Sequence, residues 1–236
     1  MKRPAARPAA VAAGGAHTDG RRTRWAEHRA ARRLVLIDAA ADAVREHGAN
    51  VGMDEIARAA GTSKPVIYRY FTDKADLYRA VVTQMAGSLL GRIVAAMDGV
   101  TEPRAEIAAG VDAFLSVLEE DPELYRFAMT HQSDAVDDVV RDYTAGIGEI
   151  ITQRLREHLT EQGRDPAAAA PWGIAMVGLI RAAGDWWLDH RAAMSRDQLA
   201  EYLTALLWGG AAGVYTLGGG SAESRVPAHL FPEREP

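Results

Sequence analysis

The sequence predicts an all-α fold of about nine helices, in which a small N-terminal head of three helices precedes a larger helical body. Alternating runs of β-branched residues between tight turns, which are typical of strands, are nearly absent. Apolar residues instead recur three and four positions apart over long stretches. The breaks between these stretches carry Gly, or Asp, Thr or Ser followed by Pro or an acidic residue, which are the usual ends and starts of helices.

The composition is that of a globular protein. The chain has 236 residues, of which 48% are hydrophobic and 25% charged, enough for one large or two modest cores. It contains no cysteine, which excludes a disulfide scaffold, an iron–sulfur cluster, zinc bound by cysteine and a thiol nucleophile. This composition is compatible with a reducing cytoplasm, where we expect the protein to reside.

Charge is distributed unevenly along the chain. Residues 1–80 carry 15 Lys and Arg against 9 Asp and Glu, a net charge of +6. The remaining residues carry 12 against 23, a net charge of −11. A basic head on an acidic body indicates that only the head meets an anionic partner.

The N-terminal part begins with residues 1–23, which are rich in Ala, Pro, Gly and Arg and lack the apolar core of a secretory signal. We interpret them as a disordered basic arm, which either adds contacts to DNA or only solubilises the chain. The first helix is predicted from Arg24 to His47, with apolar residues at helical spacing and a stop at Gly48. These inward residues are Leu34, Ile37, Ala41 and Val44.

Two short helices follow, from Asp54 to Ala60 and from Lys64 to Phe71, joined by the turn Gly61-Thr62-Ser63. Helices this short are unstable alone, so the pair is interpreted as a helix-turn-helix that presents its second helix. Ile67 and Phe71 lie four residues apart and provide that helix with an inward anchor.

The opposite side of the second helix is predicted to enter a DNA major groove, with tyrosines flanking it near phosphates. Ser63 is expected to cap this helix, and Lys74 to meet a phosphate at the start of the next helix. The candidate DNA-binding residues are Thr62, Ser63, Lys64, Pro65, Val66, Tyr68, Arg69, Tyr70 and Lys74. Taken alone, Lys64 and Arg69 are more typical of solvated surface charges, and Tyr68 is as typical of a half-buried packing residue as of a phosphate ligand; their combination with the helix-turn-helix spacing favours DNA binding.

The body begins with a long helix from Asp73 to Met97, which joins it to the head and has apolar residues four apart. Further breaks are expected at Thr101–Pro103, Asp121–Pro122, Gln132–Ser133, Gly163–Pro166 and Met194–Ser195. The body is predicted over 73–218 and a tail over 219–236. The uncharged stretch Tyr202–Ala222 is long enough to span a bilayer, but its six glycines and amphipathic pattern favour a helix of the body.

The head resembles the TetR family of transcriptional regulators from Arg24 to about Val82. That family shows an Ile-Ala-x-x-Ala-Gly-x-Ser core, then a Tyr, a following His-Phe and a Lys soon after. The matching residues are Ile56, Ala57, Ala60, Gly61, Ser63, Tyr68, Phe71 and Lys74. Met53 replaces a helix-capping Thr, Tyr70 replaces the usual His, and Lys64-Pro65 replaces a common x-Gly, which puts the operator sequence in doubt.

The resemblance implies a helix-turn-helix DNA-binding domain over 24–72 and a ligand-binding and dimerisation domain over 73–218. The expected function is that of a ligand-responsive repressor, with no enzymatic activity and no cofactor. Its expected partners are double-stranded operator DNA, a second copy of the chain and a small-molecule effector, but no membrane.

The resemblance further implies a dimer formed by the last two long helices, in which glycines at helical spacing let backbones approach closely. The relevant residues are Gly173, Val177, Ile180 and Gly184, followed by Leu199, Tyr202, Leu203, Leu206, Gly210 and Val214. A monomeric bundle whose core these residues fill is the alternative.

Candidate residues of a ligand pocket in the body are aromatic, Met and aliphatic side chains, which favour an apolar or amphipathic effector such as a lipid, a fatty acyl derivative or a hydrophobic drug. They are Phe114, Leu118, Tyr125, Met129, Ile147, Ile151, Met176, Leu179 and Trp186, and each is equally compatible with core packing. His131 and Arg181 are candidates for the polar end of an effector.

A helical enzyme and a protein-interaction bundle are the competing hypotheses. The seven histidines show no metal-binding spacing, and the chain has neither a P-loop nor a glycine-rich nucleotide motif after a strand. Asp185, Asp189 and His190 share one helical stretch but are interpreted as surface or interface residues, and no metal site is expected.

Overall fold

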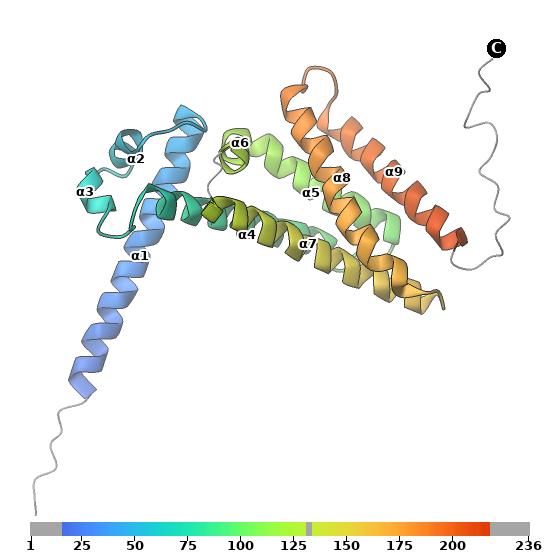
Figure 1. The fold of residues 1–236 in the computed structure, drawn as a ribbon, viewed down its shortest axis with the longest axis horizontal. Helices are drawn as coiled ribbons and strands as arrows, with labels where there is room; N and C mark the ends of the chain where they lie inside the picture. The colour runs from blue at the N-terminus through green and yellow to red at the C-terminus, as the bar shows by residue number, and fades with distance from the viewer. Residues whose placement is uncertain (1–15, 131–133, 218–236) are drawn as a thin grey trace, which may run out of the picture.

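The computed structural model describes residues 16–130 and 134–217, and within these ranges it contains nine α-helices, one short 3-10 helix and no strand. The head consists of α1 (Ala16–His47), α2 (Met53–Ala59) and α3 (Lys64–Ile67). The body consists of α4 (Lys74–Met97), α5 (Pro103–Glu120), α6 (Pro122–Thr130), α7 (Asp134–Glu161), α8 (Ala169–Asp189) and α9 (Arg196–Leu217), with the 3-10 helix at Pro166–Ala168. The predicted all-α fold is therefore confirmed (Figure 1).

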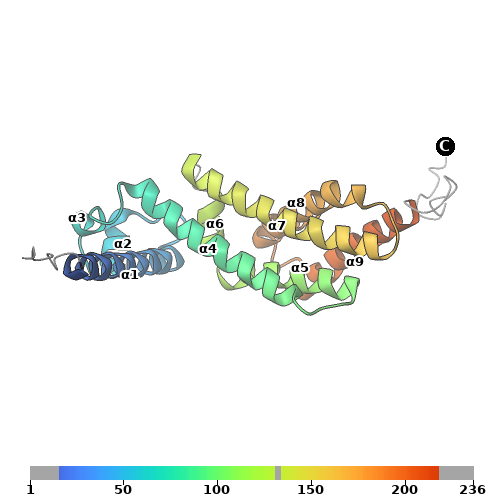
Figure 2. The same ribbon diagram turned by 90° about the horizontal axis from the view of Figure 1, so that it is seen from below.

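The molecule is elongated, with the head at one end and the long helices of the body lying roughly along the remainder of its long axis (Figure 2). In the body, α7 packs between α4 and α8, and α5 packs between α4 and α9. The short helix α6 contacts α5 and also α1 of the head. The body therefore meets the head mainly through the start of α4 and the helix α6, with further contacts from Val136 of α7 and from Asp121, which pairs with Arg45 of α1.

The head differs from the sequence prediction in three places. Helix α1 begins at Ala16, so it takes up part of the stretch assigned to the arm, of which residues 1–15 lie outside the described residues. Leu34 is 56% exposed, because Leu36 and Ile37 on the neighbouring side of α1 face the core instead. Helix α3 ends at Ile67, and the turn after it tightens, since the N–H groups of Arg69 and Tyr70 bond three residues back rather than four.

Local capping residues explain most helix boundaries. Gly48 and Gly61 have φ values of 83° and 57°, a left-handed conformation that glycine adopts without strain, and they end α1 and lead into the turn before α3. The Glu55 carboxylate accepts the N–H of Gly52 at 3.2 Å at the start of α2. Met53, which stands where the family often has a capping Thr, is buried in the core.

The apolar interior forms two clusters. The head cluster combines residues of α1–α3 and the first half of α4 with Leu124, Phe127 and Ala128 of α6. The body cluster lies among α4, α5, α8 and α9. Tyr78 of α4 donates to the carbonyl of Val51 at 2.5 Å, and its ring meets Phe127 edge-on at 4.7 Å. Helix α6 is therefore part of the head core although it belongs to the body.

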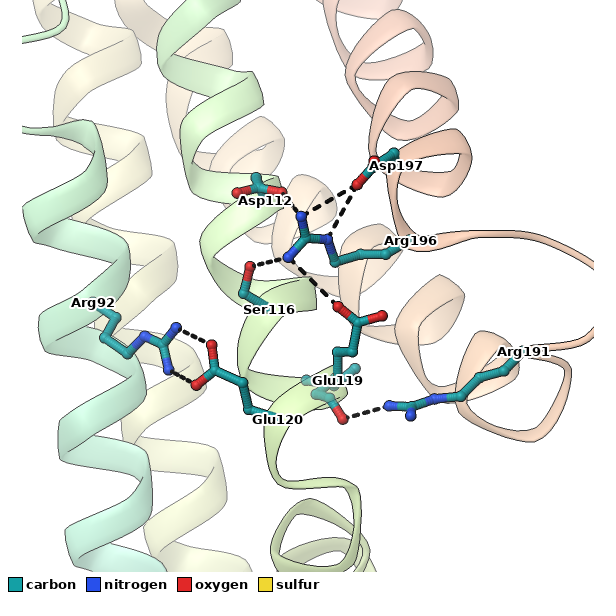
Figure 3. Close-up of polar contacts among 9 residues, drawn as sticks. Arg92, Asp112, Ser116, Glu119, Glu120, Arg191, Arg196 and Asp197 are labelled. Carbon is teal, nitrogen blue, oxygen red and sulfur yellow. Dashed lines mark hydrogen bonds and ion pairs between the residues drawn. The ribbon is translucent and has the colours of Figure 1, made fainter.

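The outer face of α5 is fastened to its neighbours by arginines (Figure 3). Arg92 of α4 pairs with Glu120 through both carboxylate oxygens. Arg196 of α9 donates to Ser116 and lies 3.6 Å from both Asp112 and Glu119. The Arg191 guanidinium donates to the carbonyl of Leu118 at 2.8 Å. These contacts hold α5 in place as one wall of the body.

Two helical stretches, Lys74–Met97 and Pro166–Asp189, are long and apolar enough to cross a membrane by length and composition alone. The core helices of globular bundles pass the same test, and α4 contributes to both apolar clusters. The stretch weighed from the sequence, Tyr202–Ala222, is not among them, and its end lies outside the described residues.

Candidate nucleic-acid interface and ligand pocket

Helix α3 is held by two buried anchors and presents its other side to solvent. Ile67 and Phe71 are 0% and 1% exposed, within the head core. Pro65, Tyr68 and Arg69 are exposed on the opposite side, and Val66 is half-buried between them. Ser63 lies at the capping position and is exposed, but its side chain makes no capping hydrogen bond.

The two predicted cations of the short helix differ in their surroundings. The Lys64 ammonium lies 2.8 Å from the Asp54 carboxylate of α2, and this contact raises the pKa of Lys64. The Arg69 guanidinium makes no ion pair within the described residues. Arg69 therefore presents an uncompensated positive charge on this surface, whereas the charge of Lys64 is already balanced.

Lys74 is exposed at the start of α4, with its ammonium 4.8 Å from the ring centre of Tyr78. One of the backbone N–H groups at the start of α4 is already used within the protein, because the Asp73 carboxylate caps α4 by accepting the N–H of Asp76 at 2.7 Å. Thr62 is half-buried in the turn, and its N–H bonds to the carbonyl of Ala57. Tyr70 is half-buried, 6.0 Å from the guanidinium of Arg29.

Sequence reasoning missed two arginines of α1 that support α3. Arg29 donates to the carbonyl of Arg69 at 3.1 Å, and Arg33 donates to the carbonyl of Tyr70 at 2.7 Å. The Arg33 guanidinium also lies 4.1 Å above the ring of Phe71. These cations sit where the carbonyl ends of a helical turn concentrate partial negative charge. The spacing of four between the two arginines was the only sequence signal that they share a face of α1.

Asp76 completes this support. Its carboxylate accepts from Arg33 and Arg79 and from the N–H and hydroxyl of Thr72. Burial alone would raise the pKa of Asp76, but these donors outweigh burial and hold that pKa well below its ordinary value. The carboxylate therefore stays ionised and ties α1, the turn after α3 and the start of α4 together.

The body contains a cavity of about 130 Å³ lined by residues of α4, α5, α6, α7 and α8 and by Trp208 of α9. A cavity needs only about 10–15 Å³ to hold one water, so this space is far larger than a packing defect. Its wall is largely apolar. Six of the predicted pocket residues line it: Phe114, Tyr125, Met129, Ile147, Ile151 and Met176. Arg181 also lines it, and His131 lies outside the described residues.

Three predicted pocket residues do not line this cavity. Leu118 is fully buried in the body cluster beside Gly184, and Leu179 is packed against the same cluster. Trp186 is 46% exposed and stacks on His190 with 4.5 Å between ring centres, on the outside of α8. On α8 the cavity is lined by Met176, Val177, Ile180 and Arg181, which share one side of the helix, whereas Leu179 packs against the body cluster and Trp186 lies on the outside.

Two polar groups of residues border the cavity. The Tyr125 hydroxyl donates to Asp185 at 2.5 Å, and burial together with this bond raises the pKa of Tyr125. At another part of the wall, Glu106 of α5 accepts from Arg154 and lies 3.4 Å from the His158 ring.

No group of three His, Asp or Glu residues in the described ranges is placed to hold a metal ion, and Asp189 pairs with Arg126.

The last two helices expose an uncharged apolar stripe. Ile174 on α8 is 69% exposed, and Tyr202 and Leu206 on α9 are 58% and 60% exposed. Leu199 and Leu203, expected on the same face, are instead buried in the body core. A Cβ on Gly173 would meet Thr152, and one on Gly184 would meet Phe114. These two glycines thus permit close packing within the chain, and the explanation of them through a partner copy was wrong.

Comparison with known proteins decides the family. Residues 36–81 match the family described as bacterial regulatory proteins, tetR family, and residues 92–222 match the tetracyclin repressor-like C-terminal domain. The second match alone covers more than half of the chain. The protein belongs to the TetR family. It is thus a transcriptional regulator with a helix-turn-helix DNA-binding domain, and the expectation that it is not an enzyme is confirmed.

Relatives of this TetR-family protein extend over most of its length. The uncharacterized HTH-type transcriptional regulator Rv0472c of Mycobacterium tuberculosis (strain H37Rv) is 35% identical over 220 residues, which cover 91% of this chain and 92% of the relative. The HTH-type transcriptional activator FasR of Mycolicibacterium smegmatis is 28% identical over 185 residues, which cover 76% of this chain and 82% of FasR.

Solved structures share the fold at lower identity. A TetR-family transcriptional regulator from Streptomyces coelicolor superposes with a TM-score of 0.60 at 24% identity, covering 78% of this chain and 82% of that one. FadR from Bacillus subtilis, solved in complex with stearoyl-CoA, gives a TM-score of 0.59 at 20% identity, covering 74% and 96%. These structures support the two-part helical architecture.

Proposed function

We propose that this TetR-family protein is a ligand-responsive, sequence-specific repressor that is released from its operator when a small apolar or amphipathic effector enters the body. The observation that carries the proposal is the position of α6, which contributes to the wall of the cavity and to the core of the head. A molecule that changes the wall at α6 therefore acts on an element to which the DNA-binding helices are packed.

The proposed DNA contacts follow from exposure and charge. Pro65, Val66 and Arg69 face the major groove, with the Arg69 guanidinium reading a guanine edge. Tyr68, Tyr70 and Lys74 reach phosphates beside that groove, and Thr62, Ser63 and Lys64 lie where the chain approaches the backbone. The ion pair with Asp54 leaves Lys64 the weaker contributor of the two cations.

The proposed assembly is a homodimer through α8 and α9. Four uncharged residues of α9, which are exposed and spaced three and four apart, form the central stripe: Tyr202, Ala205, Leu206 and Gly209. On α8, Ile174, Ala175 and Gly178 provide a second exposed stripe. Covering these exposed apolar side chains with a second copy removes them from water and stabilises the dimer. The two-fold symmetry of such a dimer would place two recognition helices one DNA turn apart.

The proposed mechanism is a population shift between two states of the dimer. The effector tilts α4, whose far half borders the cavity, and moves α6 with it, so that the spacing of the two heads no longer matches the operator. A near-complete switch requires a difference of about 5.5 kcal/mol in effector affinity between the two states. We place this regulation in the cytoplasm, in keeping with the relatives named as transcriptional regulators.

The effector class we propose is a lipid or fatty acyl compound. The apolar wall of the cavity supports it, and so does the stearoyl-CoA bound to FadR from Bacillus subtilis. FasR of Mycolicibacterium smegmatis is named an activator, so activation of some promoters is a second candidate function. A promoter reporter read in cells with and without the gene separates the two, because loss of a repressor raises expression and loss of an activator lowers it.

The DNA-binding proposal is tested by selecting operator fragments from genomic DNA with the purified protein and measuring variants on them by fluorescence anisotropy. Arg69→Ala should weaken binding by about 1–3 kcal/mol and relax base preference at one operator position. Lys64→Ala is the matched control and should lose less, because Asp54 already balances its charge. Lys74→Ala should weaken all sequences alike and lower the salt slope by about one.

The proposal of DNA contact through α3 fails if the purified protein binds no duplex in a salt-dependent manner. The assignment of roles within α3 fails if Lys64→Ala relaxes base preference while Arg69→Ala does not.

A further inference from the structure

One part of the cavity wall carries a charged cluster that the proposed function does not yet explain. It consists of Glu106 on α5 and of Arg154 and His158, one turn apart on α7, and all three line the cavity. The Glu106 side chain is 9% exposed, whereas those of Arg154 and His158 are 29% and 25% exposed. The cluster therefore lies where the cavity approaches the surface.

The cluster has hydrogen-bond donors that are not used within the protein. One carboxylate oxygen of Glu106 accepts from Arg154, and the other lies 3.4 Å from Nε2 of His158. The remaining N–H groups of Arg154 have no partner among the described residues. A guanidinium carries five N–H donors in a fixed plane and can hold a second oxygen beside the first. An oxygen that accepts hydrogen bonds is therefore the ligand group that the unused Arg154 donors suit.

The cluster and α6 lie at opposite ends of the cavity. The end of α4 at Met97 and the start of α5 at Pro103 are joined by a short loop and both line the cavity, so Glu106, one turn into α5, lies near the end of α4. Met85 and Met129 line the other end, next to the head. Met85 and Met97 are twelve residues apart on one helix, a distance of about 18 Å at 1.5 Å per residue.

We infer that the cavity binds a single-chain acyl compound whose carbonyl oxygen is held by Arg154 and His158, and that chain length decides whether DNA is released. The inference rests on the proposed function and names the effector's chemistry and its mode of control. The acyl chain runs from the cluster along the apolar wall toward α6. A short chain fills the cluster end only, whereas a long chain reaches Met129.

The end of the cavity at α6 is where a bound acyl chain affects the head. Met129 borders the cavity and packs against both apolar clusters, while Phe127 on the same helix is 1% exposed within the head core. A chain that ends before α6 leaves these contacts unchanged. Binding and release are therefore separable properties of one ligand series.

The test uses the full-length protein and a selected operator fragment. The probes are octanoyl-, lauroyl-, palmitoyl- and stearoyl-CoA, the corresponding free fatty acids, and dodecylamine as an apolar chain without a carbonyl. Calorimetry measures binding, and anisotropy measures operator release. We expect several chain lengths to bind, release to begin only at the longer chains, and dodecylamine to bind at least tenfold more weakly than the lauroyl compounds.

Variants locate the two ends. Arg154→Met should weaken acyl binding at least tenfold at every chain length, whereas Arg156→Met, on the same helix but not on the cavity wall, should not. Since Arg154→Met removes the arginine partner of the nearly buried Glu106 and leaves only His158 beside it, the double variant Glu106→Gln/Arg154→Met, which removes both charges, provides a second measurement with the same expected loss. Ile147→Trp, which narrows the middle of the cavity, should abolish release by long chains.

The outcomes separate the inference from the function on which it rests. If bound acyl compounds of all lengths release DNA equally, or if Arg154→Met and the double variant bind them normally, the inference is overturned while the repressor proposal stands. If dodecylamine binds as well as the lauroyl compounds, recognition through the carbonyl is overturned. If no compound that enters the cavity changes operator affinity, the proposed function itself fails.

Discussion

Replacing Arg33 with methionine should loosen the recognition helix from α1 while retaining an apolar stem over the ring of Phe71. In the native protein one nitrogen of Arg33 donates to the carbonyl of Tyr70 at 2.7 Å, and another donates to Asp76 at 3.1 Å. The guanidinium also lies 4.1 Å above the Phe71 ring. Methionine removes all three polar contacts and keeps most of the packing volume.

The expected loss of unfolding free energy follows from these contacts. A hydrogen bond from a charged donor contributes about 1.5–3 kcal/mol. The ion pair with Asp76 adds at most about 1 kcal/mol, because Arg33 is 36% exposed. Arg79 and Thr72 continue to hold Asp76 after the change. A total of about 1.5–4 kcal/mol corresponds to a fall in Tm of about 3–16 °C for a chain of this size.

Thermal and urea unfolding followed by circular dichroism measure this effect. Arg29→Met is the matched control, since Arg29 makes one exposed hydrogen bond of 3.1 Å to the carbonyl of Arg69 and should lose under about 1 kcal/mol. If the two variants are equally stable, the reasoning that Arg33 fastens the turn after α3 is refuted.

Two further predictions concern acid stability and close packing. The pKa of Asp76 is lowered in the folded protein, so its stabilising contribution is complete above the unfolded pKa of about 3.9 and is lost as the pH falls below that value. In Asp76→Asn, the free energy of unfolding measured by urea titration should therefore fall less steeply with decreasing pH below about pH 4 than in the native protein. An unchanged pH dependence would contradict this role. Gly184→Ala should cost about 1–3 kcal/mol in thermal melts, because the new Cβ would lie 2.7 Å from the ring of Phe114. Gly146→Ala, with no neighbour within 4 Å, should instead gain up to about 1 kcal/mol, and a reversed order of the two melts would exclude the packing argument.

The helix boundaries could be predicted because the residues that start and stop helices act locally. Gly48 adopts the left-handed conformation that ends α1, and Pro103 and Pro122 open α5 and α6 at the predicted breaks. The same holds for the turn before α3 and its inward anchors. Such features depend on a few neighbouring residues, all visible in one sequence.

The orientation of side chains could be predicted only in part. Residues 34–37 are all apolar, so periodicity alone could not tell that Leu34 faces solvent while Leu36 faces the core. The glycines of α8 posed the same problem, because a glycine that admits a partner copy and one that admits Phe114 of its own chain look alike in sequence. Both answers depend on which helix packs against the face.

The polar contacts of the head were the least predictable part of the site. Arg33 and Tyr70 are 37 residues apart, and their contact joins a side chain to a backbone carbonyl. A carbonyl has no identity in the sequence, so no residue pattern indicates this bond. Lys64 likewise qualified as a DNA contact by type, and only the folded structure shows that Asp54 already pairs with it.

Helix α6 places its two roles on different sides, since Tyr125 borders the cavity while Leu124 and Phe127 are packed into the head, and Met129 contacts both. The remaining cavity wall is supplied mostly by α4, α5, α7 and α8. An engineer seeking a biosensor for a new analyte can therefore randomise the wall on α5 and α7 and leave the head-facing side of α6 intact. The ligand specificity of the cavity would change while the contact of α6 with the DNA-binding head stays the same.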